Sequence, residues 1–362
     1  MQYQRILSLD ILRGITVALM IFVNNVRGES FEMLQHSRWN GMTLCDLVFP
    51  LFLFIMGVSC YLSLTKSDFR PTPQMLYHVV KRTVLLFAIG LFINWFEYAI
   101  RGDLLSFGTL RIWAVLQRIA LCYFFVSIFA LYCRHRYVIP LVVALLVIYA
   151  AILVFGNGYA CDASLNILAQ TDLKLFGYNH LYHMSPVDPE GLLGTIPSVA
   201  HVLLGFFCGR LIWQQKTIDQ KVISLFVSGA VLVLSGYLLS FGLPLNKYVW
   251  SPSFVLVTCG LSFLLQALLM VAIDYSSSNI TVQPTIFRFF KIFGMNALAL
   301  YVSSELLAIL LGNIGVSMWV YNAIHCVVSP QKWASLVYSI CFVLINYLIG
   351  YFLYYKKIFI KL

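Results

Sequence analysis

The sequence predicts an all-α integral membrane protein, a polytopic bundle of about ten transmembrane helices with both termini cytoplasmic. Hydrophobic residues make up 61% of the 362 residues and charged residues only 10%, against roughly 25% charged residues in soluble domains. The mean hydropathy is +0.87. No soluble domain, low-complexity tract or internal repeat interrupts this pattern, so a single transmembrane domain over residues 1–362 is expected.

The expected helices follow one another along the chain as apolar stretches of about 20 residues, which is the length that crosses a membrane. They lie at residues 8–25, 45–65, 79–99, 112–133, 137–156, 191–213, 222–243, 252–273, 289–312 and 334–355. An even number of spans leaves both termini on one side, and most Lys and Arg residues fall there, so the positive-inside rule makes that side cytoplasmic. We therefore expect a multi-pass protein of the plasma (inner) membrane.

The net charge of +10 follows from this topology, so it gives no reason to expect a nucleic-acid partner. The nine cysteines are scattered without CxxC or Cys/His metal spacing, so we expect free thiols and no metal site. The segments at about 26–44 and 157–190 are polar and face outward in this topology. Long irregular loops often carry function, so the outer face is the expected place for a site.

Polar side chains within the spans cost roughly 2.5–3.5 kcal/mol each on insertion scales, so each is a candidate functional residue. Asp10 and Arg13 lie three apart and are expected to pair. Asp46 opens the second span, where it either caps the helix or serves as the charge partner of a site. Asn296 and Glu305 lie nine apart, so we expect them to face different ways.

Arg111 and Arg118 lie seven apart and are expected to share a helix face, with Arg118 about 10 Å deeper. Arg118 then meets either a ligand phosphate or carbonyl or an internal salt bridge. The outer hairpin at 244–256 carries Asn246, Lys247 and Trp250. Trp250 fits either an aromatic belt at the membrane interface or a platform on which a sugar stacks. His36 stands in a polar, tryptophan-containing stretch, and imidazole is the usual proton acceptor at neutral pH.

Several blocks together resemble the heparan-α-glucosaminide N-acetyltransferase family. They run in order as "SLDILRGITVALMIFVNN", "HSRWNGMTLCDLVFP", "LRIWAVLQRIALCYF", "DPEGLLGTIPSVAHVLLGFFCGRL", "PLNKYVWSPSFVL" and "FGMNALALYV". The resemblance implies a polytopic membrane enzyme that moves an acetyl group from cytosolic acetyl-CoA to the amino group of a glucosamine on the far side. It also implies a homodimer. Lysosomal members carry an additional luminal portion and an additional helix, so ten helices are expected here where they have eleven.

The resemblance places the family's active-site histidine on His36 and its partner asparagine on Asn24. The spacing between the two is one residue longer here, so Asn25 is an alternative. His36 would act as general base or would itself accept the acetyl group. Asn24 would donate to the oxyanion or orient the imidazole, and Asp46 would stabilise an imidazolium.

The remaining predicted contacts divide between the two substrates. The acceptor sugar is expected to meet Trp39, Asn40, Asn246 and Trp250. Cytoplasmic cations are expected to bind the phosphates of acetyl-CoA, with a deeper arginine along the pantetheine arm. These donor-binding residues are Lys81, Arg82, Lys291 and, deeper, Arg118.

Three rival functions remain open at this stage. In a transporter, the intramembrane polar residues would line a path and His36 would gate it or relay protons, giving substrate flux without acetyl-CoA consumption. In an acyltransferase for another cell-envelope acceptor, every motif quoted above would be shared. A structural membrane subunit would leave the polar cluster unexplained.

Overall fold

The computed structural model describes residues 6–105, 107–275 and 285–360, and this part of the chain is helical without strands. Nine of its helices are long and apolar enough to cross a membrane, and a bent pair of helices adds a tenth span if it is counted as one. The helices are α1 (Leu7–Asn24), α2 (Leu44–Leu64), α3 (Pro73–Ile100), α4 (Val115–Tyr132), α5 (Val138–Phe155), α6 (Ile167–Phe176), α7 (Thr195–Gln214), α8 (Ile218–Leu239), α9 (Pro252–Leu269) with the π-helix η6 (Met270–Tyr275), α10 (Thr285–Met295), α11 (Ala297–Asn313), α12 (Val316–Val327) and α13 (Gln331–Tyr355).

The span expected at 289–312 differs from the sequence-based prediction. It forms two helices, α10 and α11, bent by 81° at Asn296. The Asn296 side chain donates to the carbonyl of Ile358 at 3.0 Å and accepts from the amide of Ile360 at 3.0 Å. Asn296 therefore bonds to the C-terminal segment at the point where the helix direction changes. The predicted pair of Asp10 and Arg13 is confirmed, with 3.5 Å between the charged atoms.

Short-range signals in the sequence explain where several helices begin. Thr43 and Asp46 form a capping box at the start of α2, in which each side chain satisfies a backbone N–H of the first turn. Ser251 caps α9 by accepting from the amide of Phe254. Pro252 follows it at the first helical position, where a missing N–H costs nothing. Both helices begin at loops that surround the candidate site described below.

Helices α2 and α7 pack closely against each other through a pair of glycines, Gly57 and Gly205. A Cβ on Gly57 would lie 2.1 Å from the carbonyl oxygen of Val202, and one on Gly205 would lie 2.2 Å from that of Phe54. Small residues let helix backbones approach this closely in membrane proteins. This contact helps to position α2, which carries Asp46 and the cavity-lining residues Cys45, Val48 and Phe49.

Replacing Gly205 with valine is therefore expected to destabilise the bundle by about 3 kcal/mol, the upper end of overpacking costs. The new side chain meets backbone atoms, which cannot rotate away. Thermal melting followed by size-exclusion chromatography in detergent measures the effect. Gly242→Val is the matched control because a Cβ at Gly242 has no neighbour within 4 Å. Equal melting temperatures for the two variants would contradict this account of the packing between α2 and α7.

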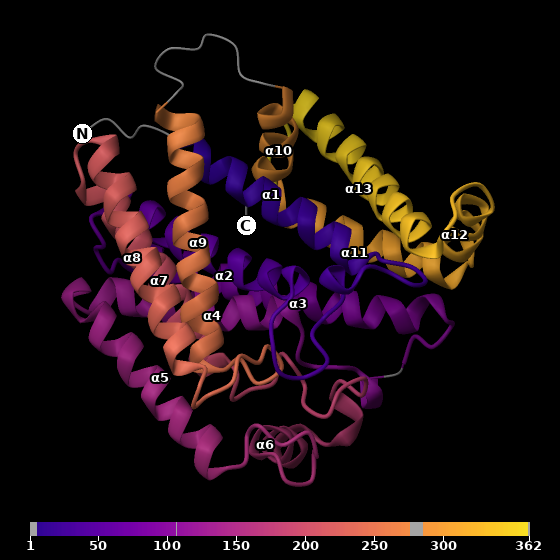
Figure 1. Ribbon diagram of the computed structural model, residues 1–362, viewed down its shortest axis with the longest axis horizontal. Helices are drawn as coiled ribbons and strands as arrows, with labels where there is room; N and C mark the ends of the chain where they lie inside the picture. Colours follow the sequence, from indigo (N-terminus) through magenta and orange to yellow (C-terminus); the bar gives the residue numbers. More distant parts are fainter. Residues whose placement is uncertain (1–5, 106, 276–284, 361–362) are drawn as a thin grey trace.

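Four connecting segments gather at one end of the bundle, which we call the His36 face: residues 25–43, 101–114 apart from residue 106, 156–194 and 240–251. The amide of Gly41 donates to the carbonyl of Leu245 at 2.7 Å, and the amide of Ile112 donates to that of His180 at 3.2 Å. Helix α6 lies within the third segment, below the bundle in the view of Figure 1. Segments far apart in the sequence thus form one continuous surface here.

Candidate active site

A cavity of about 110 Å³ lies on the His36 face between α1, α2 and the surrounding loops. Loop residues contribute ionisable side chains to its wall, and the helices contribute mainly apolar ones. A wall that combines apolar side chains with a few convergent polar groups is usual for small-molecule sites. The lining residues are Met20, Val23, Asn24, His36, Cys45, Val48, Phe49, Val115, Glu190 and Lys247.

Asp46 holds the imidazole of His36 from behind the cavity wall, with its Oδ1 2.8 Å from Nδ1 of His36. Because a carboxylate only accepts hydrogen bonds, this contact favours the tautomer with the proton on Nδ1 and the lone pair on Nε2. Asp46 Oδ2 accepts from the amides of Ser37 at 3.0 Å and Thr43 at 3.1 Å. These donors compensate the fully buried carboxylate for its lost hydration. Asp46 is therefore both a helix cap and the charge partner of His36.

Lys247 brings a cation to the same cluster from the loop between α8 and α9. Its Nζ lies 2.9 Å from Nδ1 and 3.5 Å from Nε2 of His36, and 3.3 Å from Oδ1 of Asp46. Only 12% of the Lys247 side chain is exposed. An ammonium held here can donate to the carboxylate and to a negatively charged oxygen that forms in the cavity.

The structure places Asn24 rather than Asn25 on the cavity wall. Asn24 Nδ2 donates to Oε1 of Glu305 at 3.2 Å, which holds the amide at the end of α1. Asn25 is buried and donates to the carbonyl of Ile21 in its own helix at 2.8 Å. Glu305 faces the site while Asn296 faces the C-terminal segment, as their spacing predicts.

An ion cluster fixes Glu190 on the opposite part of the wall. Nη2 of Arg111 donates to Asp188 and to Glu190, each at 2.8 Å, and its guanidinium lies 4.5 Å from the ring centroid of Tyr182. Asp188 also accepts from the amide of Tyr182 at 3.1 Å. Burial raises the pKa of Asp188, while the adjacent Arg111 lowers it. Glu190 thereby presents a carboxylate to the cavity from a rigid turn.

Arg118 supports this turn from below, and its predicted relation to Arg111 is wrong. Helix α4 begins at Val115, so Arg111 precedes the helix and does not share a face with Arg118. The guanidinium of Arg118 is buried and donates to the carbonyl of Gly191 at 2.9 Å. Arg118 lies on the first turn of α4 at the His36 face, and its partners there are other residues of the protein. It does not line the cavity, and its contact with acetyl-CoA stays a prediction.

Trp250 is buried beneath the cavity, with 1% of its surface exposed. Its ring lies 5.2 Å from the guanidinium of Arg118 and packs edge-on against Phe49 and Phe254. Neither an aromatic belt at the membrane interface nor an open platform for a sugar matches this position. The ring instead supports Phe49, which lines the cavity.

Trp39, Asn40 and Asn246 join the loops of the His36 face. The indole of Trp39 donates to the carbonyl of Tyr159 at 3.0 Å and stacks on Tyr248 at 5.4 Å. The buried amide of Asn246 donates to Oδ1 of Asn40 at 3.1 Å. These side chains do not line the cavity. The acceptor contact predicted for them would therefore be made at the surface around the mouth of the cavity.

The predicted donor-binding cations are spread over two parts of the bundle. The guanidinium of Arg82, on α3, lies 4.6 Å from the ring centroid of Tyr123. Tyr123 is eight residues further along α4 than the cavity residue Val115, or about 12 Å at 1.5 Å per residue. Lys81 is exposed beside Arg82, whereas Lys291 is half-buried on α10, a helix that packs against α1 and α13.

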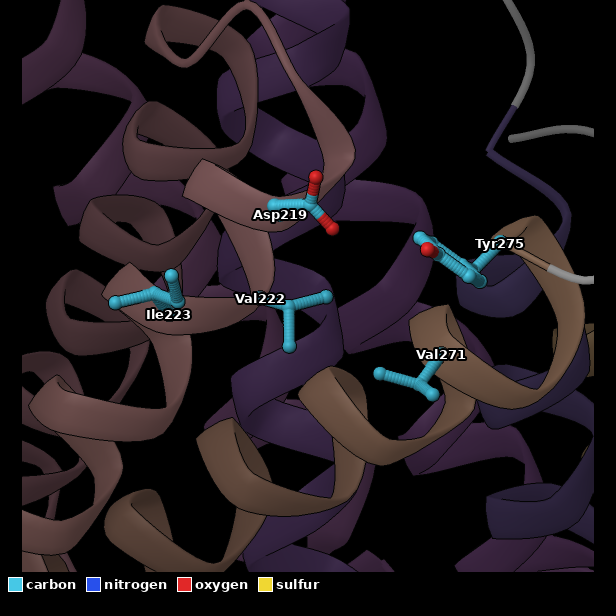
Figure 2. Close-up of a pocket in the computed structure, with 5 residues that line it drawn as sticks. All are labelled: Asp219, Val222, Ile223, Val271 and Tyr275. Atoms are coloured by element: carbon cyan, nitrogen blue, oxygen red, sulfur yellow. The ribbon is translucent and has the colours of Figure 1, made fainter.

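A second hollow, of about 210 Å³, lies between the start of α8 and η6. Figure 2 shows Asp219, Val222 and Ile223 on one side of it and Val271 and Tyr275 on the other. Its lining is mainly apolar and includes no histidine, cysteine or cation. Although it is larger, its residues offer less chemistry than those of the cavity at His36.

Sequence reasoning assigned no role to Cys45, Glu190 or Lys247, all of which line the cavity. Lys247 is 211 residues from His36, and only the folded chain brings them together. The only signal for Lys247 in the sequence was its position as a cation beside Asn246 in an outer hairpin. Glu190 stood in the quoted block that begins with Asp188, where an acidic pair follows a long outer loop.

The comparisons with known proteins concern most of this chain. Residues 5–238 match the model of the family described as heparan-alpha-glucosaminide N-acetyltransferase, catalytic. The heparan-alpha-glucosaminide N-acetyltransferases of Mus musculus and Homo sapiens are each 28% identical to this chain, over 415 and 421 aligned residues respectively. Each alignment covers 99% of this chain and 60% of the relative, so the chain spans about 60% of the length of these curated relatives. The chain belongs to the heparan-α-glucosaminide N-acetyltransferase family.

Proposed function

We propose that this protein is a membrane acetyltransferase that moves an acetyl group from cytosolic acetyl-CoA to the amino group of a glucosamine-type sugar on the outer side. The observation that carries the proposal is the pair of His36 and Asp46 on the wall of a small cavity. Both residues lie within the segment that matches the family model. Membership in the family supports the reaction class, and the pair supplies the proton chemistry that acetyl transfer to an amine needs.

His36 removes the proton that the amine must lose. A sugar ammonium cannot attack a thioester, and Nε2 of His36 carries a lone pair because Nδ1 bonds to Asp46 at 2.8 Å. The carboxylate then stabilises the imidazolium and keeps the ring in one orientation. We propose His36 as the general base and Asp46 as its positioning partner.

Two donors on the same wall suit the oxyanion that forms when the amine attacks the thioester carbonyl. The amide of Asn24 keeps one N–H beyond its bond to Glu305, and the ammonium of Lys247 lies within 3.5 Å of both ring nitrogens of His36. One such donor is worth about 2.7–4 kcal/mol of transition-state stabilisation. We propose that Asn24 and Lys247 share this task.

Glu190 is placed to recognise the amino group of the acceptor. It is the carboxylate among the cavity-lining residues, and Arg111 holds it at 2.8 Å. A cavity of about 110 Å³ is smaller than the roughly 300–1,000 Å³ that encloses a drug-sized ligand. It can therefore admit the reacting end of a sugar while the rest lies at the mouth, near Trp39 and Asn40.

The donor would approach from the opposite side. Arg82 lies between the expected cytoplasmic end of α3 and the cavity, about 12 Å along α4 from Val115, with its Nε atom buried and without a hydrogen-bond partner. It is therefore our preferred contact for the phosphate end of acetyl-CoA, with Lys81 beside it. As the family resemblance implies, we expect a homodimer in the bilayer.

Acetyl transfer by the purified protein tests the proposal directly. Labelled acetyl-CoA is supplied with glucosamine, with N-acetylglucosamine or with glucose, and label is expected on the amine of glucosamine alone. The blocked amine of N-acetylglucosamine is the matched control. Label on glucose would indicate an acyltransferase for hydroxyl groups. Failure both to bind acetyl-CoA and to label any amino sugar would contradict the proposal and favour a transporter.

Sealed liposomes test the sidedness. With glucosamine enclosed and acetyl-CoA added outside, the proposal predicts enclosed product from protein molecules whose cytoplasmic ends face outward. Product formed only when both substrates are on one side would contradict transfer across the membrane.

A further inference from the structure

The thiol of Cys45 lies within the same cluster as His36, Asp46 and Lys247. Its Sγ atom is 3.2 Å from Nδ1 and 3.8 Å from Nε2 of His36, and Cys45 lines the cavity. We propose that Cys45 is a second catalytic residue, which accepts the acetyl group from acetyl-CoA as an S-acetyl thioester and passes it to the amine. This inference rests on the proposed function, because it assigns a covalent intermediate to that reaction.

Cys45 differs from the other eight cysteines in its surroundings. All nine are free thiols in the structure. Cys60 is buried against Ser127, and Cys259 donates to a backbone carbonyl, whereas Cys45 combines a histidine contact with a place on the cavity wall. A nucleophile beside a base that a third group orients is the arrangement typical of covalent catalysis.

The geometry supplies what a thiol in this position needs. A thiol enclosed by protein attacks well only when a base takes its proton in the same step. Nε2 of His36 is that base, since Asp46 engages Nδ1. The ammonium of Lys247, beside the ring, stabilises the negative charge that develops on sulfur or on the carbonyl oxygen.

The first step exchanges one thioester for another. A bond forms between Sγ of Cys45 and the acetyl carbon, the thiol proton moves to Nε2 of His36, and the bond to the CoA sulfur breaks. The CoA thiolate takes the proton and leaves. No oxidant or reductant is required.

In the second step the acceptor nitrogen attacks the acetyl carbon on Cys45. The nitrogen–carbon bond forms, the sulfur–carbon bond breaks, and His36 moves the amine proton to the departing sulfur. The products are the amide and the original thiol. Conversion of a thioester to an amide drives the step forward.

The small size of the cavity favours a reaction in which the two substrates enter one after the other, through an acetyl intermediate on Cys45. At about 110 Å³, it is small for the thioester end of acetyl-CoA and a sugar amine together. An acetyl group held on Cys45 occupies little of that space. CoA can therefore withdraw before the acceptor enters, and the two substrates can approach from opposite sides without meeting.

Acetylation of the intact protein in the absence of acceptor tests the proposal. The wild type is incubated with labelled acetyl-CoA, quenched in acid, digested and analysed by mass spectrometry. We expect one acetyl group on Cys45, released by neutral hydroxylamine and chased onto glucosamine. Cys45→Ala should lose this label and at least tenfold in kcat, while Cys60→Ala, a matched buried cysteine, should keep both.

Each other outcome decides the matter. An acetyl group on His36 would be lost in the acid quench, because an acyl-imidazole hydrolyses in acid. It would be detected instead as exchange of labelled CoA into acetyl-CoA by Cys45→Ala, and this result would overturn the proposal. So would wild-type transfer to glucosamine without any label on Cys45, and the proposed function then stands without the relay. Absence of both label and transfer contradicts the proposed function itself. The wild-type measurement does not depend on how Cys45→Ala folds.

Discussion

Replacing His36 with alanine is expected to lower kcat for acetyl transfer by roughly 10²- to 10⁴-fold, the usual contribution of a positioned acid–base group. In both proposed routes, the direct transfer and the relay through Cys45, Nε2 of His36 is the base, so we expect neither route to survive its loss. The side chain is about half exposed on a loop, so the change should leave the helix bundle folded. Initial rates with acetyl-CoA and glucosamine measure the effect.

His183→Ala is the matched control for this variant. His183 lies in another loop of the His36 face, where its ring centroid is 4.4 Å from that of Tyr178, and it does not line the cavity. We expect it to keep near-normal activity. Normal transfer by a correctly inserted His36→Ala would overturn the assignment of His36 as the base.

Replacing Asp46 with asparagine is expected to cost roughly 10³- to 10⁴-fold in kcat, similar to the loss of the orienting carboxylate in a serine-protease triad. The side-chain amide introduced by this change would offer its NH₂ group to atoms that now donate to the carboxylate. The ring of His36 would then lose its fixed tautomer. The measurement is kcat together with the melting temperature, because Asp46 also caps α2.

Thr43→Val separates these two roles. It removes the hydroxyl, which lies 2.7 Å from the carbonyl oxygen of Gln35 and 3.0 Å from Oδ2 of Asp46, but it keeps the carboxylate of Asp46 that contacts His36. Loss of a cap costs about 1 kcal/mol of stability, so Thr43→Val should melt earlier and still transfer acetyl groups. If Asp46→Asn lost no more activity than Thr43→Val, Asp46 would be a helix cap and nothing more.

Hydropathy predicts most of the fold because each span is a local property of the sequence. The apolar stretches at 8–25 and 45–65 agree closely with α1 and α2. Hydropathy did not predict the bend at Asn296, whose side chain bonds to residues more than 60 positions away. Hydropathy records how apolar a stretch is and carries no information about such distant partners.

The site could be predicted from the sequence only in part, for the same reason. Family motifs located His36 and Asn24, and the ten-residue spacing to Asp46 suggested a pairing that the structure shows. Lys247 needed the folded chain. Arg111 was misplaced because the start of α4 was set a few residues too early, which moved Arg111 from a loop onto a helix face.

The bond between Asn40 and Asn246 joins two loops that are 206 residues apart, and the amide of Gly41 adds a backbone link to Leu245. One loop holds His36, and the other holds the cation beside it. Under the proposed function, we therefore expect a change of acceptor preference to involve both loops. The second loop lies beyond residue 238, where the match to the family model ends. The alignments to the two curated relatives nevertheless include this second loop, because they cover 99% of the chain.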